Sequence, residues 1–126
     1  MELWSSAINW FEIPVSDFDR AVKFYSAIFD YEMPVNQMGS NRMGFFLHQQ
    51  GQGIGGSIVQ GPGYVPSTTG AKVYLNGGKD LSVVLNRVTD SGGSVVIGKT
   101  EISPDIGHFA IIEDTEGNHV ALHSMS

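Results

Sequence analysis

The sequence predicts an α+β fold built from two βαβββ modules, and two observations support that prediction. The run from Asn9 to Tyr25 places an alternating segment directly before an amphipathic one, and a similar run returns near Val73, about 60 residues later. Three short segments with strand character follow each run. A repeated half in a chain of 126 residues indicates two small modules that complete one core, with a cleft between them where function is expected.

The first module is expected at about residues 7–60. Residues 8–15 alternate with period two, which predicts a half-buried strand. Ser16 and Asp17 supply N-cap chemistry for a helix whose apolar residues recur at helical spacing and which ends near Asp30. Glycine and asparagine then separate the shorter strands of an antiparallel meander, expected at residues 31–38, 43–49 and 54–59.

The second module is expected at about residues 70–124, after a proline-bearing loop at 60–70. Residues 72–76 alternate like a strand, and Asp80 can cap a helix that is stopped at Ser91-Gly92-Gly93. The closing strands are expected at residues 94–97 (or 94–101), 107–113 and 118–123. A tight hairpin turn at 114–118 joins the last two, with φ > 0 expected at Gly117. Together the modules are expected to form a single domain over residues 1–126.

Composition excludes several classes of partner. The net charge of −6, with only seven Lys plus Arg, argues against nucleic acid and acidic membranes, because both need clustered cations. No apolar run approaches the roughly 20 residues that span a bilayer, and the N-terminus lacks a basic region before a hydrophobic one. The chain has no cysteine, which excludes disulfides and thiolate sites and fits the cytoplasmic protein that we expect. A small-molecule or protein partner remains.

Three motifs carry a family resemblance. They are W-F-E-I-P-V-S-D-F-D-R-A-V-K-F-Y-S-A-I-F from Trp10, G-I-G-G-S-I from Gly53, and G-H-F-A-I-I-E-D-T-E-G-N-H-V-A-L from Gly107. In this order and spacing the chain resembles the vicinal oxygen chelate superfamily of glyoxalase I, bleomycin resistance proteins and extradiol dioxygenases. The resemblance spans nearly the whole chain and implies two βαβββ modules whose curved sheets enclose a cup.

The resemblance also implies where a metal would bind. In the superfamily's enzymes, three or four His, Glu or Gln side chains on inward strand positions hold a divalent metal, which binds vicinal oxygens of the substrate. In this sequence those positions fall on Trp10, Ser57, Lys72 (or Ala71 if the register shifts by one) and Ala121. None of these is a good ligand for a divalent metal. We therefore expect the usual metal site to be missing and no cofactor to be bound, with a divalent metal as the alternative.

Glu12 and His123 are the candidate catalytic residues. Strand parity puts Glu12 on the inward face of the first strand, and His119 and His123 on that of the last strand. Inward residues of a small cup converge, so Glu12 and His123 can form an acid–base pair or, with His119, a displaced metal site. The alternatives are a Glu12 carboxylate bonded to the backbone or to Lys72, and two surface histidines near the C-terminus.

The candidate ligand-binding residues are those left in the cup. Trp10 and Tyr74 can stack on a planar ligand, although strand aromatics more often serve packing alone. Ser57, Lys72 and His119 complete this set.

Two further features carry no functional expectation. His48 and His108 stand alone in their strands and are expected to be structural or solvated. The glycine-rich run at residues 51–56 opens a strand instead of a helix, so it lacks the context of a dinucleotide fingerprint.

We therefore expect a cytoplasmic, glyoxalase-like small-molecule-binding protein. The alternative is a lyase, isomerase or dioxygenase-type enzyme that uses Glu12 as a base or the displaced metal site. A homodimer is also expected, because two curved sheets leave exposed edges and only Lys72 guards the fifth strand with a charge. The alternative is a monomer whose edges are protected by Pro62, Pro66 and the flanking loops.

Overall fold

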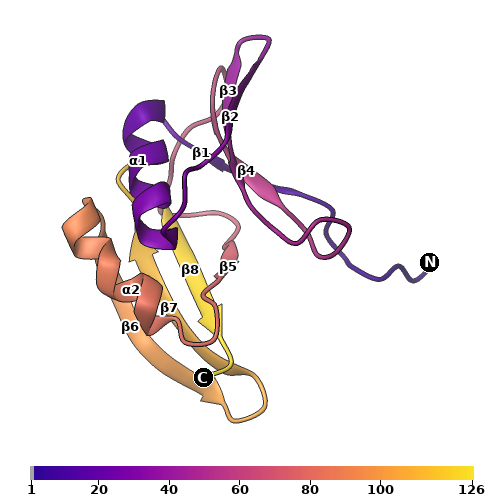
Figure 1. The fold of residues 1–126 in the computed structure, drawn as a ribbon, viewed down its shortest axis with the longest axis vertical. Helices are drawn as coiled ribbons and strands as arrows, with labels where there is room; N and C mark the ends of the chain where they lie inside the picture. The colour runs from indigo at the N-terminus through magenta and orange to yellow at the C-terminus, as the bar shows by residue number, and fades with distance from the viewer. Residues whose placement is uncertain (1) are drawn as a thin grey trace.

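The computed structural model describes residues 2–126 and contains two βαβββ modules (Figure 1). The first comprises β1 (Phe11–Pro14), α1 (Phe18–Phe29), β2 (Val35–Met38), β3 (Asn41–Phe46) and β4 (Gly56–Gln60). The second comprises β5 (Tyr74–Asn76), α2 (Ser82–Val88), the 3-10 turn η1 (Thr89–Ser91), β6 (Ser94–Ser103), β7 (Gly107–Glu113) and β8 (His119–Ser124). The α+β fold class and the repeated βαβββ order are confirmed.

Each module forms its own four-stranded sheet. Sheet A has the order β1-β4-β3-β2 and sheet B the order β5-β8-β7-β6. In both, the first strand runs parallel to the last strand of its module, and all other neighbours are antiparallel. Because side chains alternate along a strand, each sheet has a helix face, packed on its module's helix, and a helix-free face turned away from it.

The first strand of each module is shorter than its periodicity predicts. β1 begins at Phe11 instead of residue 8, and β5 begins at Tyr74, so the exposed Lys72 precedes the strand instead of lying within it. A strand exists only where a neighbour pairs with it, and the partner of Phe11 is Gly56, the first residue of β4. β6 in turn extends to Ser103, beyond both predicted ends, because β7 pairs with it from end to end.

The predicted helix boundaries are close to the observed ones. The Asp17 carboxylate accepts a hydrogen bond from a first-turn amide of α1 at 3.2 Å, and Asp30 ends the helix in the left-handed region with φ 53°. Around α2, the Asp80 carboxylate accepts a first-turn amide at 2.9 Å, and Gly92 ends the following turn with φ 105°. The apolar stripe of α1 is buried and comprises Phe18, Ala21, Phe24, Tyr25 and Ile28.

One cluster of buried apolar side chains joins both sheets and both helices. Sheet A supplies Ile13 and Ile58, and sheet B supplies Leu75, Ala110 and Leu122. α1 contacts both β4 of its own module and α2 of the other, and both helices lie on the same side of the molecule (Figure 1). The two modules therefore share one hydrophobic core, with α1 as the element common to both halves.

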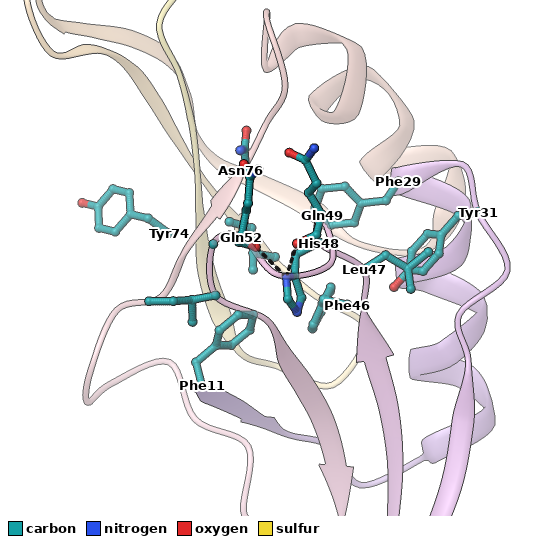
Figure 2. A pocket seen from close by; sticks show the side chains of 13 residues that line it. Phe11, Phe29, Tyr31, Phe46, Leu47, His48, Gln49, Gln52, Tyr74 and Asn76 are labelled. Atoms are coloured by element: carbon teal, nitrogen blue, oxygen red, sulfur yellow. Dashed lines mark hydrogen bonds between the residues drawn. The ribbon is translucent and has the colours of Figure 1, made fainter. Parts of the chain in front are cut away.

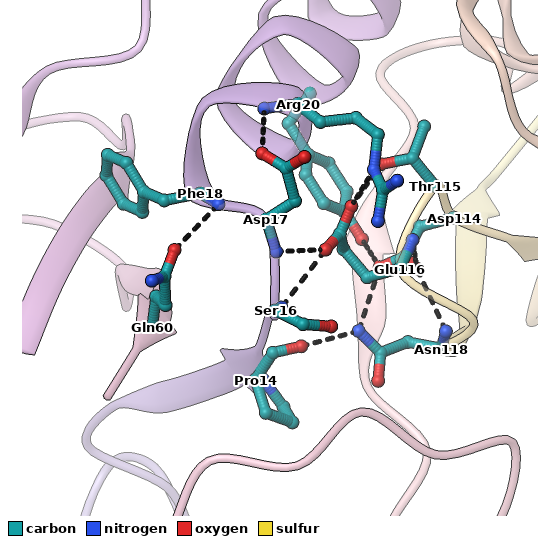
Figure 3. A network of polar contacts seen from close by, with 11 residues as sticks. Pro14, Ser16, Asp17, Phe18, Arg20, Gln60, Asp114, Thr115, Glu116 and Asn118 are labelled. Carbon is teal, nitrogen blue, oxygen red and sulfur yellow. Dashed lines mark hydrogen bonds and ion pairs between the residues drawn. The ribbon is translucent and has the colours of Figure 1, made fainter. Parts of the chain in front are cut away.

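Glu116, in the turn between β7 and β8, ties the second module to the first (Figure 3). Its buried carboxylate accepts hydrogen bonds from the amides of Ser16 and Asp17 at 3.0 and 2.7 Å, directly before α1, and from the half-exposed Arg20 guanidinium at 2.7 Å. Burial by itself would raise the pKa of Glu116, but the hydrogen bonds from Arg20, Asp17 and Thr115 outweigh it and lower that pKa. The turn is thus held by charge-assisted hydrogen bonds.

The same turn reaches the core through Asp114. This carboxylate accepts a hydrogen bond from the buried Tyr25 hydroxyl at 2.7 Å, and burial, followed by the charge of Asp114, raises the pKa of Tyr25 well above its usual range. Asn118 donates from Nδ2 to the Pro14 carbonyl at 2.7 Å. Gly117 has φ 90°, so the predicted tight turn with a left-handed glycine is confirmed.

Candidate functional site

Three of the predicted site residues lie together on the helix-free face of sheet A. Glu12 is opposite Ser57 in the pairing of β1 with β4, and Trp10 packs against Phe45 with ring centroids 6.3 Å apart. Glu12 is exposed, and its carboxylate accepts a hydrogen bond from the Tyr64 hydroxyl at 2.7 Å. This hydrogen bond is the main cause that raises the pKa of Tyr64. The partner of Glu12 is therefore a tyrosine, where a backbone group, Lys72 or His123 was expected.

Ser57 is the most deeply placed of these residues. Its side chain is fully buried, and its hydroxyl has no hydrogen-bond partner within residues 2–126. Phe45 lies opposite Ser57 on β3, as Glu12 does on β1, so the hydroxyl sits beneath neighbouring side chains of the same face.

Tyr74, His119 and His123 lie on the helix-free face of sheet B, whereas the exposed Lys72 lies before β5. Tyr74 is opposite Ala121, and His123 is opposite Asn76. The Nε2 atom of His119 lies 3.0 Å from the Glu113 carboxylate. Nε2 of His123 donates to the Ile106 carbonyl at 2.6 Å, because a carbonyl can only accept.

The two sets of residues do not meet in one catalytic group. Glu12 pairs with Tyr64 and His123 pairs with a loop carbonyl, so the expected Glu12–His123 pair is not formed. Within residues 2–126 no three His, Cys, Asp or Glu side chains lie close enough to hold a metal ion, so Glu12, His119 and His123 do not form the displaced metal site that was considered. Strand parity places residues on faces correctly, but it cannot show how far apart two sheets stand.

The positions where the fold would hold a metal do not fit one. Trp10 presents an indole, Ser57 a single buried hydroxyl, Lys72 an ammonium group and Ala121 a methyl group. These groups offer neither the imidazoles nor the carboxylates that divalent metals prefer. No chemical step is therefore assigned to a metal, and the absence of a bound metal stays a prediction.

A groove of about 670 Å³ lies elsewhere, where the helix face of sheet A meets β5 (Figure 2). Its walls are aromatic and aliphatic, and its polar groups come from the loop between β3 and β4 and from β5. None of its lining residues within the described chain is charged. The lining residues used below are Phe11, Phe29, Phe46, Leu47, His48 and Asn76. Of the predicted site residues, only Tyr74 borders this groove.

The aromatic wall depends on a missing side chain in β4. Gly56 is opposite both Phe11 and Phe46 in the sheet, and the two rings meet across it with centroids 5.5 Å apart. A Cβ atom at Gly56 would lie 2.3 Å from the Phe11 ring. Phe29 of α1 then meets Phe46 edge to face at 6.2 Å. Gly56 falls inside the strand predicted at residues 54–59, and a glycine inside a strand often marks a close approach of other groups. It was therefore a sequence signal that could have indicated the aromatic wall.

His48 stands at the other end of the groove and was not predicted to take part. Its Nδ1 atom contacts the main-chain carbonyls of Gln49 and Gln52 at 3.1 and 2.9 Å, which fixes the ring in the loop. Tyr31 closes the helix side, where its hydroxyl donates to the Phe45 carbonyl at 2.9 Å and burial raises its pKa to about 12. A lone histidine in a sequence gives no sign of such a setting, because the loop carbonyls that orient it are main-chain atoms.

Comparison with known proteins places this fold among relatives. A protein from Didymella fabae described as a glyoxylase-like domain-containing protein is 32% identical over 123 residues, which cover 91% of each chain. Among solved structures, TnmS3, an antibiotic binding protein from Streptomyces sp. CB03234, is 21% identical with a TM-score of 0.66, over 99% of this chain and 100% of that one. A glyoxalase I mutant from Zea mays is 13% identical with a TM-score of 0.67, over 93% of this chain and 45% of that one.

Two further findings bear on the class of protein and on its family. Within residues 2–126 no helix is long and apolar enough to cross a membrane. The profile of the Glyoxalase/Bleomycin resistance protein/Dioxygenase superfamily matches residues 7–122, which is most of the sequence. With this match, the 32% identical relative and the doubled βαβββ fold, the chain belongs to the Glyoxalase/Bleomycin resistance protein/Dioxygenase superfamily.

Proposed function

We propose that this chain is a small-molecule-binding protein that holds its ligand in the aromatic groove and works without a resident metal ion. The groove itself carries the proposal: it has about 670 Å³, within the usual range of ligand sites, and combines an aromatic wall with a few polar groups. TnmS3, which shares the fold, is described as an antibiotic binding protein, and this gives the proposal a precedent. The expected cytoplasmic location belongs to the proposal and rests on the cysteine-free composition.

A blocked groove tests this function. Leu47 borders the groove and is 66% exposed, so Leu47→Trp places an indole at the groove without disturbing the core. Val65 is 75% exposed and does not border the groove, so Val65→Trp is the matched control. Both variants are screened, after treatment with a chelator, against a library of metabolites and aromatic antibiotics by ligand-observed NMR.

We expect compounds that bind the wild type to bind Val65→Trp equally and to lose affinity for Leu47→Trp. Equal binding by all three proteins would show that the ligand binds outside the groove. If no compound in the library binds the wild type, the proposed function is wrong.

The enzymatic alternative has one observation in its favour, the hydrogen-bonded pair of Glu12 and Tyr64. This pair lies on the helix-free face of sheet A, whereas the groove borders the helix face. Glu12→Gln keeps the shape of the side chain and removes a base. Ligand binding in the groove should not change in this variant. A reaction that the wild type catalyses and Glu12→Gln does not would favour the enzymatic alternative.

A further inference from the structure

We infer that the groove takes an uncharged, flat molecule that offers a hydrogen-bond donor to Nε2 of His48 and an acceptor to the amide of Asn76. This inference rests on the proposed function and names the chemical class of its ligand.

The protonation of His48 follows from its neighbours. Both groups that Nδ1 contacts are main-chain carbonyls, which only accept, so Nδ1 must carry the hydrogen. In the neutral ring Nε2 is then an acceptor. The described residues supply no hydrogen-bond partner for Nε2, and in Figure 2 the ring edge that carries it points away from the loop carbonyls. This edge lies beside Gly55, where a Cβ atom would be 2.9 Å from Nε2, and His48 lines the groove. A ligand with an N–H or O–H group satisfies this atom.

Asn76 has the opposite polarity. Its Oδ1 atom accepts a hydrogen bond from the Gly78 main-chain amide at 2.9 Å, and an amide N–H can only donate, so this contact fixes which end of the side chain is oxygen. The Nδ2 group is left as a donor at the edge of the groove, on β5. A ligand carbonyl or ether oxygen can accept from it.

The walls select shape and charge. The ring of Phe46 meets Phe11 at a tilt of 35° and Phe29 at 87°, so the wall presents both faces and edges to a ring that enters the groove. No lining residue within residues 2–126 carries a charge, so an ionised ligand would lose water without gaining a counter-ion. The groove therefore favours a neutral aromatic or heteroaromatic molecule over an anion or a cation.

A series of naphthalene probes separates these features. A neutral naphthol offers the donor, methoxynaphthalene replaces it with an acceptor, and naphthoate adds a negative charge. Titration followed by NMR should show the naphthol binding roughly three- to tenfold more tightly than methoxynaphthalene, the ratio expected for one hydrogen bond. Naphthoate should bind at least about tenfold more weakly than the naphthol.

Two variants test the named atoms. His48→Phe removes the acceptor, so the naphthol should lose its advantage over methoxynaphthalene while both still bind. Asn76→Asp keeps the oxygen that caps Gly78 but removes the donor, so an acetyl-substituted naphthol should lose affinity while the parent naphthol keeps it. Circular dichroism confirms that each variant is folded.

The outcomes separate the ligand class from the binding function. A naphthol advantage that persists in His48→Phe, or that is absent from the wild type, overturns the inference. Library compounds that bind in the groove while none of the naphthalene probes does would also overturn it, with the proposed function intact. If neither probes nor library compounds bind, the proposed function fails and the inference fails with it.

Discussion

Gly56 shows how one residue without a side chain shapes the groove. It sits between Phe11 and Phe46 in the sheet, where any Cβ atom would meet the Phe11 ring at 2.3 Å. The ring packs against both Phe46 and the core, so moving it away from a Cβ atom would break these contacts. The close approach of the two rings, and therefore the aromatic wall, depends on this glycine.

Gly56→Ala should therefore destabilise the protein by about 1–3 kcal/mol, the usual cost of overpacking, and weaken binding in the groove. The control is Gly98→Ala, since no atom of residues 2–126 lies within 4 Å of a Cβ atom at Gly98. Chemical denaturation gives the free energy of unfolding of both variants. Equal values for the two would show that Phe11 moves aside without cost.

Gly117 tests backbone conformation without any packing effect. Its φ is 90°, and in the part of the chain that the structure describes no atom lies within 4 Å of a Cβ atom placed there. Gly117→Val should cost at least about 1 kcal/mol, from backbone strain alone. The matched variant Gly98→Val has open space and no such φ, so it should leave the melting temperature nearly unchanged. An unchanged melting temperature for Gly117→Val would mean that the turn is looser than its hydrogen bonds indicate.

The residues at the family's metal positions predict the metal content. With Trp10, Ser57, Lys72 and Ala121 at those positions, protein purified without a chelator or a metal-affinity tag should contain no stoichiometric divalent metal. Elemental analysis by mass spectrometry measures this directly. One equivalent of zinc or a similar ion per chain, surviving dialysis, would contradict the prediction.

At the scale of elements, the turn between β7 and β8 is the strongest polar link between the modules. Glu116 joins this turn to the start of α1, and the Arg20 guanidinium covers it from solvent. An element of the second module thereby fixes the position of a helix of the first, and α1 in turn carries Phe29 to the groove. Groove geometry and module pairing are therefore linked.

Glu116 should also make stability depend on pH. Its pKa in the folded protein lies below its ordinary value of 4.5, so it contributes stability above about pH 4.5, and this contribution is lost as the pH falls through the lowered pKa. Glu116→Gln should cost about 1–3 kcal/mol at pH 7 and flatten the decline below pH 4.5. Denaturation midpoints between pH 3 and 7 measure both effects. If Glu116→Gln loses stability at low pH as steeply as the wild type, another group causes the acid sensitivity. Asp80, whose pKa is lowered to about 2, is the next candidate.

At the scale of the whole molecule, the exposed surface is large for the mass. The chain exposes 7687 Å², whereas a folded monomer of 13.6 kDa is expected to expose roughly 6,600 Å². Part of the excess is apolar: Leu3 and Trp4 are 90% and 79% exposed, and Val95, Val96 and Ile97 of the edge strand β6 are each at least 40% exposed. Exposed apolar surface and an open sheet edge both favour association.

We therefore propose a homodimer in solution that buries at least about 1,000 Å² in total. Light scattering at micromolar concentration should give a mass near two chains. Val96→Lys and Ile97→Lys place charges on the β6 edge and should shift the mass toward one chain if this strand lies in the interface. A wild-type mass near one chain at every concentration would refute the dimer.

The fold class and most of the helices and strands could be predicted from the amino-acid sequence. Hydrophobic periodicity, the caps at Asp17 and Asp80, and the turn at Gly117 are properties of short segments, and each was read correctly because neighbours in the sequence decide it. Strand parity also placed Trp10 with Glu12 and His119 with His123 on shared faces.

Which faces of the two sheets meet depends on tertiary packing and could not be predicted. Glu12 and His123 lie on different sheets, and the distance between the sheets is set by the packing of α1 and by the Glu116 turn, not by periodicity. The groove could not be predicted either, because its wall residues Phe11 and Phe46 look like ordinary core residues in the sequence. Its polar end depends on main-chain carbonyls that orient His48, and main-chain atoms are the same in every sequence.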